Sequence, residues 1–198
     1  MNSVLITGKG TYGFGQIGKP KPGPNQVLIK VDSCVVNPSD ILFMRGLYNI
    51  KHAYPYTPGW EGSGTVVEVG SGLLSGLFKG KRVAFNKQFE TGTYKIGGSM
   101  ADYCLTDVKS CIPLNDDISL EQGAALFVNP LTALGMVDRL IEKRCKAVIV
   151  TAAASQIGRM IIKLCQQSHI TPICLVRREK QAEFLRNDLK QKFVVDTS

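Results

Sequence analysis

The sequence predicts an α/β protein with a β-rich N-terminal domain at residues 1–118 and one half of a doubly wound parallel sheet at residues 119–198. Two patterns predict this division. Up to about residue 115, short β-branched runs alternate with turns rich in glycine and proline. From Lys146 onward, short apolar runs alternate with segments of helical spacing in the order β-α-β-α-β, as expected of parallel strands joined by helices.

The N-terminal domain contains several expected strands, each a β-branched or alternating run next to a turn signal. Gly70-Ser71-Gly72 ends one such run, and Lys79-Gly80-Lys81 precedes another. Closely spaced strands and turns of this kind are typical of an all-β domain. The expected strands cover residues 1–6, 26–36, 62–69, 82–85 and 99–105.

Two helix-start signals open the second part of the chain. Ser119 and Gln122 have the spacing of a capping box. Asn129 precedes Pro130, which places a favourable N-cap residue before proline at the first helical position and predicts a helix to about Ile141. The following expected strands cover residues 147–151, 172–176 and 193–195, and the expected helices cover residues 156–167 and 179–189.

The charge balance argues against a nucleic-acid-binding protein. The 24 Lys and Arg residues exceed the 16 Asp and Glu residues and give a net charge of +8. The basic residues are scattered, and no basic stripe interleaved with aromatic residues is found. We therefore interpret them as dispersed, solvated side chains, and a docking surface for an acidic partner is the alternative.

The cysteines and the apolar runs indicate the compartment. None of the six cysteines forms a C-x-x-C pair, and no secretory signal is recognised, so reduced thiols are expected. The sequence therefore predicts a protein of the mitochondrial matrix or the cytoplasm. The apolar runs are far shorter than the roughly 20 residues needed to cross a bilayer, and no membrane span is expected.

The stretch between the first strand and the first helix of the C-terminal half is a candidate phosphate-binding turn. Small residues there allow a tight turn and bring a pyrophosphate close to the helix N-terminus. Ala153, Ser155 and Gly158 stand where such turns carry glycine, and Gln156 and Ile157 begin the helix. These five residues are candidate cofactor-binding residues, and a purely structural turn is the alternative.

Two arginines, Arg177 and Arg178, follow the second strand of this half. An NAD site usually places an acidic residue near this point to bind the ribose 2′-hydroxyl, whereas an arginine fork binds a 2′-phosphate. The pair therefore predicts NADPH as the cofactor in preference to NADH. The alternative is that the arginines, Arg178 above all, are solvated at the start of the next helix.

The sequence resembles a known family, the medium-chain dehydrogenase/reductase superfamily. The similar motifs follow the family order over nearly the whole chain: residues 36–40 (VNPSD), 58–62 (PGWEG), 66–70 (VVEVG), 79–83 (KGKRV), 123–125 (GAA) and 129–133 (NPLTA). The resemblance implies a GroES-like β domain followed by a Rossmann domain, with the active site in the cleft between them.

The resemblance also implies that no metal is bound. Zinc enzymes of the superfamily carry cysteine where this chain has Asn37 and histidine where it has Trp60. Neither side chain is a usual zinc ligand. The chain has only two histidines, His52 and His169, and we interpret His52 as a surface residue.

Among the zinc-free relatives, the quinone reductases and the 2-enoyl thioester reductases, the motifs are most similar to the enoyl reductase branch. In that branch, the tyrosine that matches Tyr48 assists proton delivery after hydride transfer. The chemistry agrees, because a phenol can donate a hydrogen bond to an enolate without a metal. Asn37 is the second candidate catalytic residue, and Asn129 and Thr132 are candidate cofactor contacts. The alternatives are a packed loop aromatic for Tyr48 and a helix cap for Asn129.

The length of the chain raises a second interpretation. A complete Rossmann sheet has the strand order 3-2-1-4-5-6, and this chain contains the first three strands. The strand at residues 147–151 is then expected at an open edge, which invites pairing.

Two interpretations of function follow. The chain is part of an NADPH-dependent reductase of an enoyl thioester or a quinone, expected to form a homodimer at full length. Alternatively, it is a catalytically inactive relative in which other protein subunits cover the open Rossmann edge.

Overall fold

The computed structural model describes residues 1–48, 51–52, 54–87, 93–94 and 98–198, with the backbone alone for residues 51–52 and 93–94. The contacts divide the chain into two compact units, Met1–Val128 and Asn129–Ser198. Each unit has its own hydrophobic core.

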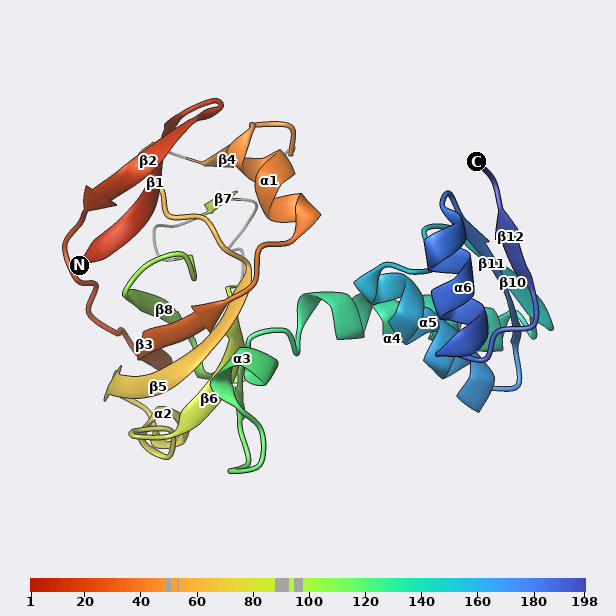
Figure 1. Ribbon diagram of the computed structural model, residues 1–198. Coiled ribbons are helices and arrows are strands. Elements are labelled where there is room, and N and C mark those ends of the chain that lie inside the picture. Colours follow the sequence, from red (N-terminus) through yellow and green to blue (C-terminus); the bar gives the residue numbers. More distant parts are fainter. Residues whose placement is uncertain (49–50, 53, 88–92, 95–97) are drawn as a thin grey trace. The chain divides into compact units, whose positions relative to one another are not determined.

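An antiparallel sheet of five strands forms the centre of the first unit, in the order β8-β3-β5-β6-β9 (Figure 1). Alternate residues of β3, such as Val27 and Ile29, point to the same face and join Val66, Val83 and Phe85 in the buried core. The strands are β3 (Gln26–Cys34), β5 (Glu61–Val69), β6 (Arg82–Asn86), β8 (Tyr103–Asp107) and β9 (Cys111–Pro113).

A second small core forms between the N-terminal hairpin and the first helix. Ile6 of β1 packs with Phe43 and Met44 of α1 and with Tyr56. The remaining elements of this unit are β1 (Asn2–Gly8), β2 (Thr11–Gln16), α1 (Pro38–Met44), β4 (Lys51–His52), α2 (Leu73–Gly76), β7 (Thr93–Tyr94) and a 3₁₀ turn (Val108–Ser110).

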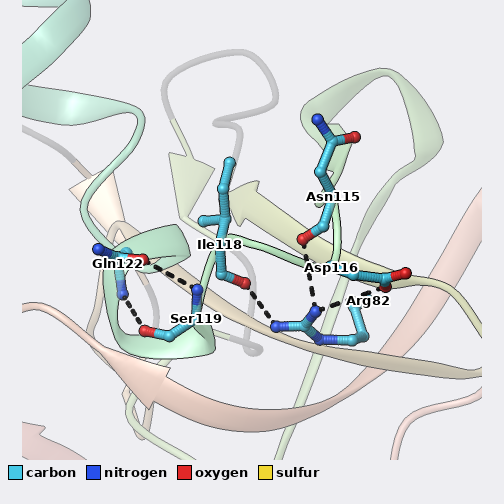
Figure 2. A network of polar contacts seen from close by, with 6 residues as sticks. All are labelled: Arg82, Asn115, Asp116, Ile118, Ser119 and Gln122. Carbon is cyan, nitrogen blue, oxygen red and sulfur yellow. Dashed lines mark hydrogen bonds and ion pairs between the residues drawn. The ribbon is translucent and has the colours of Figure 1, made fainter.

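Arg82 of β6 holds the segment that leads from β9 to α3 (Leu120–Gly123), as Figure 2 shows. Its Nη2 donates a hydrogen bond to the carbonyl oxygen of Ile118 at 2.6 Å. Its Nη1 lies 3.4 Å from the carbonyl oxygen of Asn115 and 4.0 Å from the carboxylate of Asp116. The guanidinium therefore satisfies two carbonyl groups of a segment that has no ladder of its own.

The predicted capping box at the start of α3 is confirmed (Figure 2). The hydroxyl of Ser119 accepts from the N–H of Gln122 at 3.2 Å, and Oε1 of Gln122 accepts from the N–H of Ser119 at 3.0 Å. α3 contacts β3, β5 and β6 and so belongs to the first unit.

The second unit is built on three parallel strands in the order β10-β11-β12 (Figure 1). α5 packs against β10 and β11, and α6 packs against β11 and β12. Their shared core contains Val150, Ile162, Cys174 and Leu185. The elements are α4 (Val128–Glu142), β10 (Ala147–Val150), α5 (Gln156–Gln167), β11 (Thr171–Val176), α6 (Glu179–Asn187) and β12 (Val194–Asp196). The predicted fold class, a β-rich domain followed by a partial three-stranded Rossmann sheet, is confirmed.

Some details differ from the sequence prediction. α4 begins at Val128, so Asn129 lies in the first turn and not at the N-cap. The strand expected at residues 99–105 begins at Tyr103, because Ala101 makes only a single bridge, to Ser3. Within the residues that the structure describes, no helix combines the length and the apolar character needed to cross a membrane.

The close approach of β3 and β5 depends on Gly64. A Cβ atom at this position would collide with the carbonyl oxygen of Lys30 and lie 2.9 Å from Cγ2 of Ile29. We therefore expect Gly64→Ala to lower the free energy of unfolding by about 1–3 kcal/mol, measured by urea denaturation. Gly13→Ala in β2 is the matched control, since no atom lies within 4 Å of its added Cβ. An equal loss in both variants would contradict this explanation.

Candidate functional site

The second unit has a cavity of about 410 Å³ at the carboxyl ends of β10 and β11. Ser155 and Arg177 line it, together with Thr151, Gln181 and Thr197. In open α/β sheets, ligands bind outside the carboxyl ends of the strands. The cavity therefore lies where a nucleotide is expected.

The turn before α5 is tight and is held by a helix cap. Ser155 is the N-cap of α5, and its hydroxyl accepts from the N–H of Gly158 at 3.1 Å. A Cβ atom on Gly158 would lie 2.6 Å and 2.8 Å from the carbonyl oxygens of Ala153 and Ala152. Gly158 thus has the packing role of the third glycine of the Rossmann turn, and the turn fits a dinucleotide.

The structure separates the two arginines that follow β11. Arg177 lines the cavity, whereas Arg178 is the N-cap residue of α6 and is not among the lining residues. Both side chains are exposed. A phosphate in this cavity would therefore meet Arg177 first.

The other candidate cofactor residues do not all line this cavity. Ala153 is buried beneath the turn, and the amide oxygen of Gln156 accepts from Arg159. Ile157 and Thr132 line a second, apolar groove of about 720 Å³ between α4, β10 and α5. Asn129 lies in the first turn of α4.

This second groove borders the open side of β10. Ile149 of β10 is 62% exposed, and Leu131 and Met136 of α4 are also largely exposed. Among the described residues, β10 pairs only with β11. The unit thus presents a contiguous apolar surface beside an unpaired strand edge, which is typical of an interaction surface.

In the first unit, Tyr48 belongs to an aromatic cluster. Its ring centroid lies 5.8 Å from that of Trp60 and 6.5 Å from that of Phe43. Phe43 is buried, whereas Tyr48 is 42% exposed. The contacts hold the ring on one side and leave part of the side chain accessible to a ligand.

Asn37 is held by two buried carboxylates. Its backbone N–H donates to Oδ2 of Asp40 at 2.7 Å, and its side-chain Nδ2 donates to Oε1 of Glu61 at 2.9 Å. Asn37 is 3% exposed, and Asp40 and Glu61 are fully buried. Both nitrogens of Asn37 are therefore committed to the protein interior.

The surroundings of Asp40, including Glu61, change the ionisation of its carboxyl group. Burial raises the pKa of the Asp40 carboxyl to about 6, the backbone N–H groups of Asn37 and Trp60 oppose this rise, and the charge of Glu61 adds to it. Among the described residues, neither Asp40 nor Glu61 has an ion-pair partner.

The described part of the chain shows no group of three or more His, Cys, Asp or Glu side chains that could hold a metal ion. The side chain of His52 lies outside the described residues. All six cysteines are free, and burial raises the pKa of Cys104 and Cys111 to about 12.

The sequence prediction missed Asp40 and Glu61 as parts of the candidate site. The sequence could have indicated a role for Asp40. Asn37, Pro38 and Asp40 have the spacing of a helix start with an acidic residue at its third position. Glu61 is the first residue of a strand, and nothing local to it indicates burial.

A GroES-like β unit and a Rossmann unit with a nucleotide-type turn define a medium-chain dehydrogenase/reductase. Residues 23–116 match the family profile of the alcohol dehydrogenase GroES-like domain. The chain belongs to this superfamily, and its homologues include quinone oxidoreductase-like and enoyl reductase proteins.

Two curated relatives show these two branches. Quinone oxidoreductase-like protein 2 of Mus musculus is 39% identical over 145 residues, which are 72% of this chain and 39% of that protein. The mitochondrial enoyl-[acyl-carrier-protein] reductase of Caenorhabditis elegans is 31% identical over 171 residues, which are 86% of this chain and 47% of that protein. The chain thus spans less than half of these relatives.

Solved structures have the same fold. A Mesorhizobium loti protein that bears the name NADPH:quinone reductase superposes with a TM-score of 0.88 and 36% identity, covering 100% of this chain and 60% of that one. A mycobacterial protein solved with NADPH has a TM-score of 0.81 and 24% identity, covering 100% of this chain and 59% of its own, and shows the fold alone.

The raised pKa of Asp40 predicts a pH-dependent contribution to stability. Because the folded-state pKa of about 6 lies above the ordinary value of 3.8, this contribution is complete below about pH 4 and is lost as the pH rises through about 6. Asp40→Asn keeps an oxygen for the Asn37 N–H but does not titrate. We expect it to remove a pH dependence of up to roughly 3 kcal/mol, measured by denaturation between pH 4 and pH 7.5.

Asp102→Asn is the control for this experiment. Asp102 also accepts a backbone N–H, from Asn2 at 2.7 Å, but it is exposed. Its variant should keep the wild-type pH profile. A wild-type profile in Asp40→Asn would contradict the assignment.

Proposed function

We propose that this chain provides the GroES-like domain and the first half of the cofactor domain of an NADPH-dependent reductase that acts on a quinone or on an activated C=C bond. The observation that supports this most directly is the 410 Å³ cavity, which combines a capped helix N-terminus with Arg177. Both quinone reductases and an enoyl reductase are homologues, so both substrate classes stay open.

NADPH, when bound, supplies the hydride. In this proposal the backbone N–H groups at the start of α5 and the hydroxyl of Ser155 hold the pyrophosphate. Ala153 and Gly158 keep the turn close to the sheet, and Gln156 and Ile157 supply the first N–H groups of the helix. Arg177 binds the 2′-phosphate, since its fork matches phosphate geometry. Asn129 and Thr132 of α4 stay candidate contacts on the nicotinamide side, and Arg178 stays a weaker candidate.

Tyr48 is the proposed proton donor. Reduction of an enone or enoyl thioester leaves negative charge on the carbonyl oxygen, and the hydroxyl of Tyr48 can donate a hydrogen bond to that oxygen or a proton to the product. Its partial exposure supports this role. Asn37 acts indirectly, because both of its nitrogens donate to buried carboxylates. The step requires no metal, which agrees with Asn37 and Trp60 at the positions of zinc ligands in related enzymes.

The oligomeric state and the cellular location are also proposals. We infer a homodimer for a full-length reductase, and a location in the mitochondrial matrix or the cytoplasm. The mitochondrial name of the Caenorhabditis elegans relative supports the first of these locations.

A second candidate function rests on the unpaired edge of β10. In this alternative the chain is an inactive relative whose partner subunits cover the apolar surface around Ile149, Leu131 and Met136. NADPH titration separates the two functions, because the alternative predicts no saturable binding.

Arg177 should determine the preference for NADPH over NADH. We expect Arg177→Ala to weaken NADPH binding by about 10- to 100-fold and to leave NADH binding nearly unchanged, since only NADPH has the 2′-phosphate. Fluorescence titration of both cofactors measures this. Arg178→Ala is the matched control and should have a much smaller effect. Equal losses for NADPH and NADH would show that Arg177 does not contact the 2′-phosphate.

Tyr48 should affect turnover and not cofactor binding. In a preparation that oxidises NADPH with a quinone or a 2-enoyl thioester, we expect Tyr48→Phe to lower kcat by about 100-fold or more, because the proton donor is lost. The dissociation constant of NADPH should stay within about threefold. Tyr54→Phe tests another exposed ring of the same cluster and should keep kcat. Parallel loss of kcat and NADPH affinity would argue against proton delivery by Tyr48.

A further inference from the structure

Glu61 is a fully buried carboxylate with three hydrogen-bond partners. Its Oε1 accepts from Nδ2 of Asn37 at 2.9 Å. Its Oε2 accepts from the backbone N–H groups of Phe127 at 3.0 Å and Val128 at 2.8 Å. All three partners are donors, which is the arrangement that an ionised carboxylate requires.

Burial of this carboxylate is unfavourable unless it is compensated. A carboxylate removed from water loses several kcal/mol of solvation, and buried carboxylates are usually paired with a cation. Among the described residues Glu61 has no such cation, and a second buried carboxylate, Asp40, lies close enough to interact with it. Three charge-assisted hydrogen bonds and the positive end of α4 replace the cation.

The partners of Glu61 belong to the two segments that carry the candidate functional residues. Asn37 immediately precedes α1, and Tyr48 follows α1 by four residues. Val128 begins α4, and Asn129 and Thr132 follow it in the same helix.

We propose that Glu61 is a positioning residue, whose single carboxylate orients the side-chain amide of Asn37 and fixes the start of α4 at the same time. A neutral side chain cannot accept hydrogen bonds from both groups as the carboxylate does. Glutamine at this position has one acceptor oxygen and one donor nitrogen, so either Asn37 or the two backbone N–H groups would meet a donor. The part of this inference that concerns turnover rests on the proposed reductase function, whereas the part that concerns orientation does not.

The first experiment measures orientation without activity. In the full 198-residue chain, Glu61→Gln should accelerate hydrogen exchange at the N–H groups of Phe127 and Val128 by about 10- to 100-fold, because they lose a charged acceptor. It should also shift the NMR signals of the Asn37 side-chain amide. Glu68→Gln is the matched control, since Glu68 lies on the same strand but is partly exposed and paired with Lys19 at 2.6 Å. It should leave both sites unchanged.

A reciprocal variant tests the orientation of the amide. In Asn37→Asp alone, two carboxylates would face each other and destabilise the unit. In the double variant N37D/E61Q, the new amide nitrogen can donate to the new carboxylate at position 37, while the amide oxygen accepts from Phe127 and Val128. We expect Phe127 and Val128 to be better protected from exchange in the double variant than in Asn37→Asp, and at least as well protected as in Glu61→Gln, because the amide oxygen is then held toward the two N–H groups.

The second experiment measures turnover in a preparation that oxidises NADPH. Glu61→Gln should lower kcat by about tenfold or more while the KM for NADPH stays within about threefold, because orientation and not cofactor affinity is lost. Loss of kcat in proportion to unfolded protein would indicate a merely structural group and overturn the positioning role.

The two experiments fail separately. If the wild-type chain shows no saturable NADPH binding, the proposed function fails, and the exchange experiment still decides the role of Glu61. If Glu61→Gln leaves Phe127, Val128 and Asn37 unchanged, or accelerates exchange equally throughout the unit, the positioning role is wrong whatever the activity.

Discussion

The pairing of β3 with β5 is the constraint on which the candidate site of the first unit depends. The two strands run antiparallel, with Cys34 opposite Gly62. This register brings the carboxyl end of β3 to the amino end of β5, so that Asn37 and Glu61 meet although 24 residues separate them. The strands approach closely at Gly62 and Gly64, where a Cβ atom would meet the facing carbonyl groups. The pairing of β3 with β5 therefore determines both the spacing of the strands and the polar contacts at the site.

The candidate site of the second unit depends on the direction of its strands. In a parallel sheet all carboxyl ends share one edge, so the turns after β10 and β11 are neighbours, and the N–H of Ala153 donates to the carbonyl oxygen of Leu175 at 3.2 Å. Ser155 follows the first strand, Arg177 the second, and Thr197 the third. The cavity is thus a consequence of strand direction, whereas the polar cluster of the first unit depends on individual hydrogen bonds.

Much of the fold could be predicted from the sequence, because the sequence signals for its helices and caps are local. The helix at Gln156–Gln167 and the capping box at Ser119 depend on residues within one or two turns of each other, and both are confirmed. The burial of Glu61 could not be predicted, since it depends on register between distant strands. The sequence also does not distinguish Arg177 from Arg178. Only the end of β11 and the start of α6 determine which one lines the cavity.

The composition of the turn before α5 has a consequence for how a ligand would bind. Rossmann turns usually carry glycine where this chain has Ala153 and Ser155. Alanine and serine restrict the backbone in the unfolded and unliganded states, and the bond from the Gly158 N–H to the Ser155 hydroxyl holds the turn in shape. A ligand at this site would therefore meet a preorganised turn, and little conformational entropy would be lost on binding. Compared with a glycine-rich Rossmann turn, this turn has a more restricted backbone and the same close packing at Gly158.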